Sequence, residues 1–222
     1  MIIAAELIPP WLSTSLWIGL LLTTGLAARY ADWAALRRVH ARYHLFFGGI
    51  VFCVVLWLMS VRVIDGLWIH FLGATTLTLI LGWRFAMLAG TVAVLAHTTL
   101  VGQPLAAISA AWLFTVAIPV TVSRTLVYLL RRLKTRNLFI YMLGAGFGGG
   151  LLCVLAVALV AVPLLWVSGQ QDWALAALAN WPLITLLLFP EGFINGMIVT
   201  TLTVFYPDLV KTFDDTYYLG KP

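Results

Sequence analysis

Charged side chains are scarce in this sequence of 222 residues: Asp, Glu, Lys and Arg make up 9% of it, and hydrophobic residues 63%. Soluble domains contain about 25% charged residues, which cover the surface that faces water. The mean hydropathy of +1.03 agrees with this imbalance. The composition therefore excludes a soluble globular protein and predicts one integral membrane domain that comprises residues 1–222.

Cysteines and catalytic motifs are also lacking. The two cysteines, Cys53 and Cys153, lie in long apolar runs, which excludes a disulfide framework and favours small buried side chains. The sequence contains no H-E-x-x-H, G-x-S-x-G, Walker A or C-x-x-C motif. We therefore predict no enzymatic activity, no ATP hydrolysis by this chain alone and no covalent cofactor.

Seven apolar segments predict an all-α, polytopic transmembrane helix bundle, because a span needs about 20 mostly apolar residues. Residues 68–81 are short for a full span, which indicates tilting or burial inside the bundle. Gly82 and Arg84 mark a tight turn, and Pro119 predicts a kink. The expected spans are 11–28, 45–61, 68–81, 85–101, 105–130, 138–167 and 183–205.

The basic residues predict the orientation of the chain. With seven spans and the N-terminus outside, twelve of the thirteen Lys and Arg residues fall inside and only Arg62 falls outside, as the positive-inside bias expects. Two spans after residue 174 would instead place the C-terminal tail outside. Because the basic residues flank apolar segments, the net charge of +5 indicates a multi-pass protein of the inner (plasma) membrane rather than nucleic-acid binding.

Two histidines lie where ionisable groups are costly and are therefore functional candidates. His70 begins the short third segment; it is either a ligand for a transition metal or an interfacial histidine at a helix start. His97 lies near the same predicted outer face. It is either a second ligand or, as we favour, a buried histidine bonded to a threonine or a carbonyl. His40 and His44 lie among arginines and are expected to contact water or headgroups.

Glu191 and Asn195 lie one turn apart on one helix face, next to Pro190. They would contact a cation or, as we favour, form a hydrogen bond to another helix. Gly144 and Gly148, overlapping with Gly146 and Gly150, form G-x-x-x-G patterns that allow helices to approach closely.

Two segments carry a family resemblance. IHFLGATTLTLILGWRFAMLAG and FPEGFINGMIVTTLTVFYPDLV resemble the H-x-x-G-x-x-L-x-x-x-x-G and late E-G-x-I-[TN] regions of the CbiM-type permeases. These are the cobalt- and nickel-binding subunits of energy-coupling-factor ABC transporters. The resemblance implies seven helices, a divalent transition metal as substrate, and three kinds of partner: the lipid bilayer, a transmembrane coupling subunit and ATPase subunits.

The resemblance also implies a set of nitrogen ligands, namely the amino terminus, a histidine directly after the initiator Met, and the third-helix histidine, here His70. This sequence has Ile2 in place of the second of these. We therefore expect a metal site rebuilt with His97 or Glu6, a different substrate, or no metal site at all. A membrane scaffold or assembly factor that keeps the fold without the site is the alternative function.

Overall fold

Among the residues that the computed structural model describes, six helices are long and apolar enough to cross a membrane, which confirms the predicted class of fold. The structure describes all residues except 1, 4, 39, 65–66, 135 and 220–222. Four of these spans are α1 (Pro10–Tyr30), α3 (His40–Leu58), α4 (Ala74–Leu100) and α9 (Trp181–Phe205). The other two are continuous runs, one of α5 (Ala107–Trp112), η2 (Leu113–Ala117) and α6 (Ile118–Arg132), and one of η3 (Ile140–Gly148) and α7 (Gly149–Val167).

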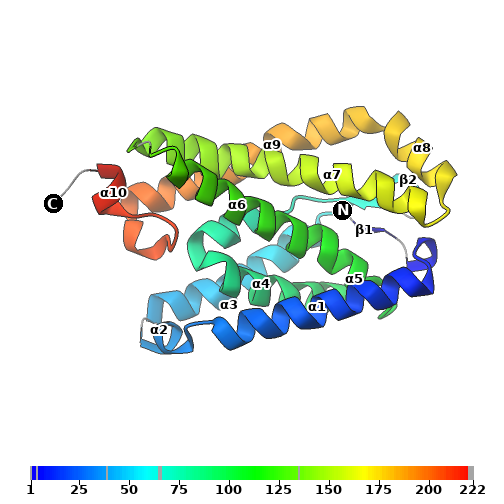
Figure 1. Cartoon of the computed structure of the whole chain (residues 1–222), viewed down its shortest axis with the longest axis horizontal. Coiled ribbons are helices and arrows are strands. Elements are labelled where there is room, and N and C mark those ends of the chain that lie inside the picture. The colour runs from blue at the N-terminus through cyan, green and yellow to red at the C-terminus, as the bar shows by residue number, and fades with distance from the viewer. Residues whose placement is uncertain (1, 4, 39, 65–66, 135, 220–222) are drawn as a thin grey trace.

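The remaining elements are short and lie between the spans or at the chain ends (Figure 1). Three strands form a small antiparallel sheet in the order β1–β3–β2. They are β1 (Ile2–Ile3), β2 (Val61–Ile64) and β3 (Leu67–Ile69), and the short helices are η1 (Ala5–Leu7), α2 (Trp33–Arg38), α8 (Gln171–Ala179), η4 (Pro207–Leu209) and α10 (Asp215–Leu219).

The predicted third and fourth spans are the two arms of α4. Gly82 has φ 75° and ψ 158°, a left-handed conformation that interrupts the helix. Phe85, just after this break, packs against Phe46 near the start of α3, whereas His97 in the last turn packs against Trp57 near the end of α3. The chain therefore reverses at Gly82, and residues 74–81 and 83–100 pass in opposite directions.

The prediction for the third span is wrong in one respect. Its first residues, Trp68 and Ile69, form β3, and the helix begins only at Ala74. The segment 74–81 therefore crosses only part of the bundle. Its side chains are buried apart from the half-exposed Ile80, as expected for a short helix enclosed by neighbours rather than by lipid.

Prolines and glycines shape the other spans. The π-helical stretch η2 (Leu113–Ala117) ends two residues before Pro119, so a helix distortion lies close to the proline at which the sequence predicts a kink. Pro182 lies in the first turn of α9, and Pro190 lies inside it without ending the helix. The final apolar region thus forms a lead-in helix, α8, and one span, as predicted.

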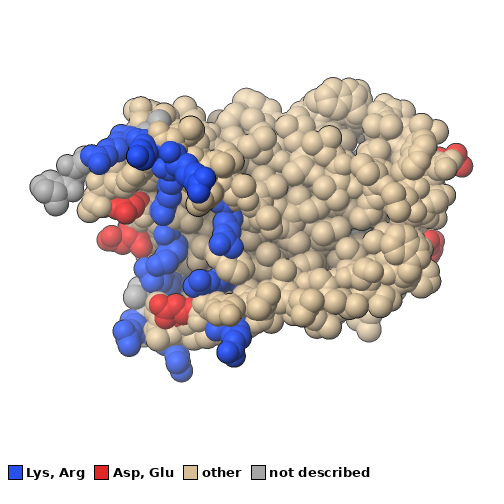
Figure 2. Space-filling model, in the orientation of Figure 1, with Lys and Arg blue, Asp and Glu red and all other residues tan. Residues whose placement is uncertain are grey.

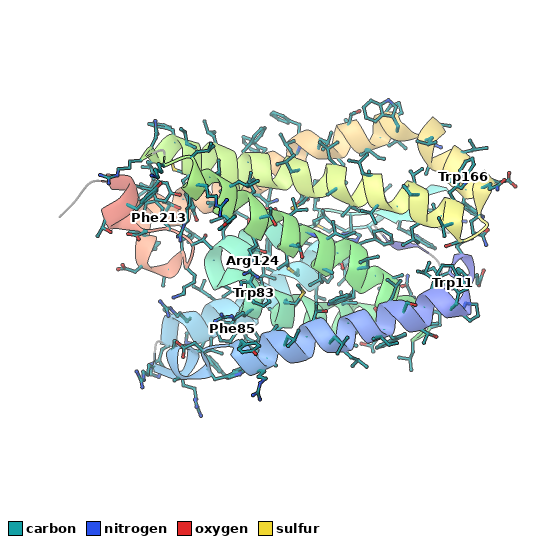
Figure 3. The ribbon with its side chains drawn as sticks, in the orientation of Figure 1. Trp11, Trp83, Phe85, Arg124, Trp166 and Phe213 are labelled. Atoms are coloured by element: carbon teal, nitrogen blue, oxygen red, sulfur yellow. The ribbon has the colours of Figure 1, made fainter. Side chains whose placement is uncertain are left out.

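Lys and Arg gather at one end of the molecule, which carries α2 and α10 (Figures 1 and 2). We call it the basic end; α1, α6 and α9 end there. The middle of the molecule is apolar, with lipid-facing side chains such as Leu159 and Leu186 more than 70% exposed. Trp11 and Trp166 lie at the opposite end (Figure 3), where tryptophans commonly mark a membrane interface. By the positive-inside bias the basic end is the inner one, and α1 starts outside.

Candidate metal-binding site

His70 lies in a connection, residues 70–73, that joins the small sheet to α4. β3 ends at Ile69 and is the central strand, paired on one side with β2 and on the other with β1. Ile2 pairs with Trp68, so the beginning of the described chain lies beside the residues that lead into His70. The pairing joins segments that are far apart in the sequence and positions this histidine inside the bundle.

The environment of His70 favours a neutral ring with one defined tautomer. Its side chain is 2% exposed, and Nδ1 lies 2.8 Å from the carbonyl oxygen of Phe71. A carbonyl only accepts, so Nδ1 carries the proton and Nε2 has the lone pair. Burial lowers the pKa of this imidazole well below its ordinary value of 6.5, and a neutral imidazole is the form that binds metal ions.

Trp57 of α3 lies against both candidate histidines. Its ring centroid is 6.0 Å from that of His70 and 6.2 Å from that of His97. Its indole N–H donates to the carbonyl oxygen of Leu72 at 3.0 Å, which ties the connection 70–73 to α3. One aromatic ring therefore brings together two histidines that the sequence separates by more than a span.

His97 is buried, with 4% of its surface exposed, and its Nε2 has no hydrogen-bond partner among the residues that the structure describes. The hydrogen bonds found for Thr98 and Thr99 go to helix carbonyls. The His97 ring instead has a hydrogen bond to the backbone of Trp57, in line with the expected bond to a carbonyl. An unsatisfied buried nitrogen requires an explanation, and a bound ion or water is one.

A small pocket adjoins His70 on the side of α7 and α9. It has a volume of about 30 Å³, and its walls include Leu72, Val157 and Leu187. A single water molecule needs about 10–15 Å³ of such space. The pocket is therefore large enough for one small occupant beside the imidazole, and its apolar walls offer that occupant no competing ligand.

Glu191 and Asn195 bind the beginning of α4 rather than lying free. The carboxylate of Glu191 accepts hydrogen bonds from the backbone N–H groups of Leu72 at 2.7 Å and Gly73 at 2.9 Å. The Asn195 Oδ1 accepts from the N–H of Thr76 at 2.9 Å and from its hydroxyl at 2.7 Å. A negative group at a helix N-terminus satisfies donors that the helix leaves unpaired.

The two side chains also bond to each other, with Asn195 Nδ2 donating to Glu191 Oε1 at 2.7 Å. Both are 1% exposed. The expected interhelical hydrogen bonds are therefore present, and α9 binds the backbone that begins two residues after His70.

Glycines determine how closely α9 approaches α7. A Cβ on Gly150 would lie 2.9 Å from the carbonyl oxygen of Glu191, and one on Gly146 would lie 3.2 Å from the Cα of Gly196. Gly144 faces Leu130 instead, and a Cβ on Gly148 would meet a carbonyl of its own segment. Of the overlapping G-x-x-x-G patterns, the pair 146 and 150 thus forms the α7–α9 contact.

Two features of this region were not predicted from the sequence. One is the matching pattern on α9 itself, Gly192 and Gly196, which repeats the same spacing. The other is a buried polar cluster that includes Thr75, close to the connection 70–73. Thr75 lies 3.2 Å from the Cys153 sulfur and accepts from Ser123 at 3.1 Å. All three side chains are at most 1% exposed. In the sequence, only their position inside long apolar runs distinguishes these residues.

The other predicted site residues lie apart from this region or stay untested. Glu6 lies in η1 and is exposed, and His40 and His44 lie at the start of α3 towards the basic end. No group of three or more His, Cys, Asp or Glu side chains that could hold a metal ion occurs among the described residues, which do not include Met1. A metal site at His70 therefore stays a prediction.

Two comparisons with known proteins agree with this architecture. Two crystal structures, one of a transition metal transporter and one of a truncated transition metal transporter, each superpose with a TM-score of 0.75 at 20% identity. They cover 92% of this chain and 93% and 99% of their own. This likeness shows a shared fold. No curated protein matches the chain.

The family comparison covers nearly the whole sequence. The CbiM family, described as the cobalt uptake substrate-specific transmembrane region, matches residues 3–209. That range includes the connection 70–73, both histidines and the Glu191–Asn195 pair. The chain therefore belongs to the CbiM family of membrane proteins.

Proposed function

We propose that this chain is the membrane-embedded, substrate-binding subunit of a transition-metal uptake system, with cobalt or nickel as substrate. Membership of a family described by cobalt uptake supports this function. The observation that carries it is the pair of buried imidazoles on Trp57: His70 with its lone pair on Nε2, and His97 with an Nε2 that has no partner among the described residues. Imidazole suits nickel, cobalt, copper and zinc.

The remaining ligands would come from the beginning of the chain. The pairing of Ile2 with Trp68 supports a role for the amino terminus, as the family resemblance implies. Because Ile2 stands where the resemblance implies a histidine, His97 is our candidate for the missing nitrogen, and Glu6 is a weaker one because it is exposed.

The energy for uptake would come from other proteins. The sequence has no Walker A motif, which supports a transmembrane coupling subunit and ATPase subunits in the inner membrane as partners. This arrangement would make the chain one subunit of an energy-coupling-factor ABC transporter. The absence of a histidine at position 2 favours the second candidate function, a membrane scaffold that has kept the fold without the site.

Metal titration of the purified protein in detergent tests the proposal. Nickel, cobalt, copper and zinc are titrated against wild type and against His70→Ala, His97→Ala and His44→Ala, with any affinity tag at the C-terminus. We expect saturable binding that His70→Ala abolishes. We expect His97→Ala to weaken binding at least tenfold, because loss of a group that only supports a ligand already costs about 10- to 100-fold. His44→Ala is the matched control, because it removes a histidine far from Trp57 and should bind like wild type.

Binding of none of the four metals by wild type would reject the proposed substrate and favour the scaffold function. Binding that survives His70→Ala would instead show that the metal sits elsewhere. Equal loss in all three variants would indicate weak surface binding to histidines in general.

A further inference from the structure

A second pocket lies at the basic end, between α4, α6 and the segment after α9. It has a volume of about 320 Å³, and three cationic side chains line it, Arg84, Arg124 and Lys211. The polar residues Asp32, Thr78 and Thr212 also line it, and its apolar walls include Trp83 and Val127. It lies apart from the His70 site, because it surrounds the chain reversal at Gly82.

Arg124 is held in place by an aromatic ring rather than by an acidic partner. Its guanidinium carbon lies 4.4 Å from the centroid of the Trp83 ring, and that of Arg84 lies 5.6 Å from the same ring. Figure 3 shows Arg124 next to Trp83, with Phe85 beyond it. Stacking on a ring face fixes the plane of a guanidinium and leaves its edge donors available.

The charge of this pocket is not balanced within the described part of the chain. Three cations face it together with one carboxylate, that of Asp32. The Asp32 Oδ1 already accepts the N–H of Ala35 at 3.0 Å, which caps α2. The pocket therefore has an excess of positive charge.

Arg124 lies well before the end of α6, so its charge is placed further from the basic end than that of the other arginines of this helix. It precedes Arg131, near the end of the helix, by about two turns, or roughly 10 Å. A cation at this depth is costly unless it meets a negative group or extends to the interface. Arginine binds phosphate through paired N–H donors. Apolar walls beside the cations fit the glycerol and upper acyl chain that accompany a lipid phosphate, and not a free ion.

We propose that this pocket binds the headgroup of an anionic phospholipid, with the lipid phosphate at Arg124, Arg84 and Lys211 and the adjoining chain against Trp83 and Val127. Basic pockets between transmembrane helices on the cytoplasmic side recognise such headgroups. The proposal is independent of whether His70 binds metal, since the two sites share no residue.

The test measures lipid binding to the purified, delipidated protein. Native mass spectrometry detects the bound lipid, and thermal unfolding measures its effect on stability. The probes are phosphatidylglycerol, phosphatidylcholine and inorganic phosphate. We expect phosphatidylglycerol to remain bound and to raise the unfolding temperature, and phosphatidylcholine and inorganic phosphate to have little effect. Arg124→Gln should weaken the binding of phosphatidylglycerol about tenfold. Arg132→Gln is the matched control, because Arg132 also stacks on a ring, that of Tyr128 at 4.8 Å, but does not line the pocket.

Three outcomes would overturn the proposal. Inorganic phosphate as effective as the lipid would make this a site for a soluble anion. Equal effects of phosphatidylglycerol and phosphatidylcholine would remove the role of charge. Equal losses in Arg124→Gln and Arg132→Gln would show general attraction to a basic surface. Should Arg124→Gln fail to fold, Arg84→Gln and Lys211→Gln take its place in the same comparison.

Discussion

The carboxylate of Glu191 is the side chain whose loss should damage this fold most clearly. Glu191→Ala removes the acceptor of two buried backbone donors, the N–H groups of Leu72 and Gly73. A hydrogen bond to a charged group contributes about 1.5–3 kcal/mol. The loss of two such bonds should therefore lower the free energy of unfolding by about 3–6 kcal/mol. Because Glu191 is 1% exposed, bulk water has no direct access to the freed N–H groups, which favours the upper part of this range.

Cysteine labelling can measure this loss. Cys53 and Cys153 are free and buried, so a thiol reagent reacts with them only when the protein opens. The protein is titrated with SDS in mixed micelles, and labelling gives the unfolding curve of each variant. Phe193→Ala is the control on the same helix, because the Phe193 ring is 53% exposed to lipid. Glu191→Gln keeps one acceptor oxygen and should lie between wild type and Glu191→Ala.

This reasoning is refuted if the free energy of unfolding of Glu191→Ala lies within about 0.5 kcal/mol of that of the control. Such a result would mean that the connection 70–73 finds other acceptors when the carboxylate is absent. A folded Glu191→Ala protein at low temperature gives a further readout. Because Leu72 and Gly73 lie two and three residues after His70, metal binding at His70 should weaken more in this variant than in Glu191→Gln.

Further predictions concern helix contacts and the C-terminal segment. Gly150→Ala should destabilise the protein by about 1–3 kcal/mol, because the added Cβ would overlap α9. Gly19→Ala should be nearly neutral, because nothing lies within 4 Å of a Cβ at that position. The cysteine-labelling assay compares the two variants. Thr212→Val should cost about 1 kcal/mol, because its hydroxyl donates to a carbonyl of α4 at 2.8 Å. The hydroxyl of Thr216 donates to Asp214 and holds the pKa of that carboxyl below its ordinary 3.8. The cap of α10 should therefore persist above pH 3.8 and be lost as the pH falls further, measured by hydrogen exchange.

The spans could be predicted from the sequence because lipid imposes a simple requirement on composition. Apolar runs of sufficient length are recognisable without any knowledge of packing. The start of the third pass could not be predicted in this way. Trp68 and Ile69 are apolar whether they form a strand or a helix, and short apolar runs do not distinguish the two. Their strand pairs with the neighbouring β2 and also with β1, where Ile2 faces Trp68; the second pairing is a contact between distant parts of the chain.

The candidate site was predicted only as a set of residue types. His70 and Glu191 could be singled out because ionisable groups are rare in apolar segments. That Trp57 would lie against both histidines, and that Glu191 would bind the backbone after His70, depends on how the helices pack. Of the overlapping glycine pairs, Gly146 and Gly150 face α9, and the sequence alone gives no preference between them and their neighbours.

The two ends of the short helical segment 74–81 explain the positions of the polar residues on α9 and on the segment after it. A helix that ends inside a bilayer leaves unpaired N–H groups at its start and unpaired carbonyls at its end, and no water can satisfy them. Glu191 and Asn195 satisfy the start. The backbone N–H groups of Lys211 and Thr212 donate to carbonyls at the end, at 3.0 and 3.1 Å. Both sets of partners belong to α9 and the chain that directly follows it. A displacement of α9 alone would therefore expose unpaired groups at both ends, so α9 and the segment that follows His70 must move together.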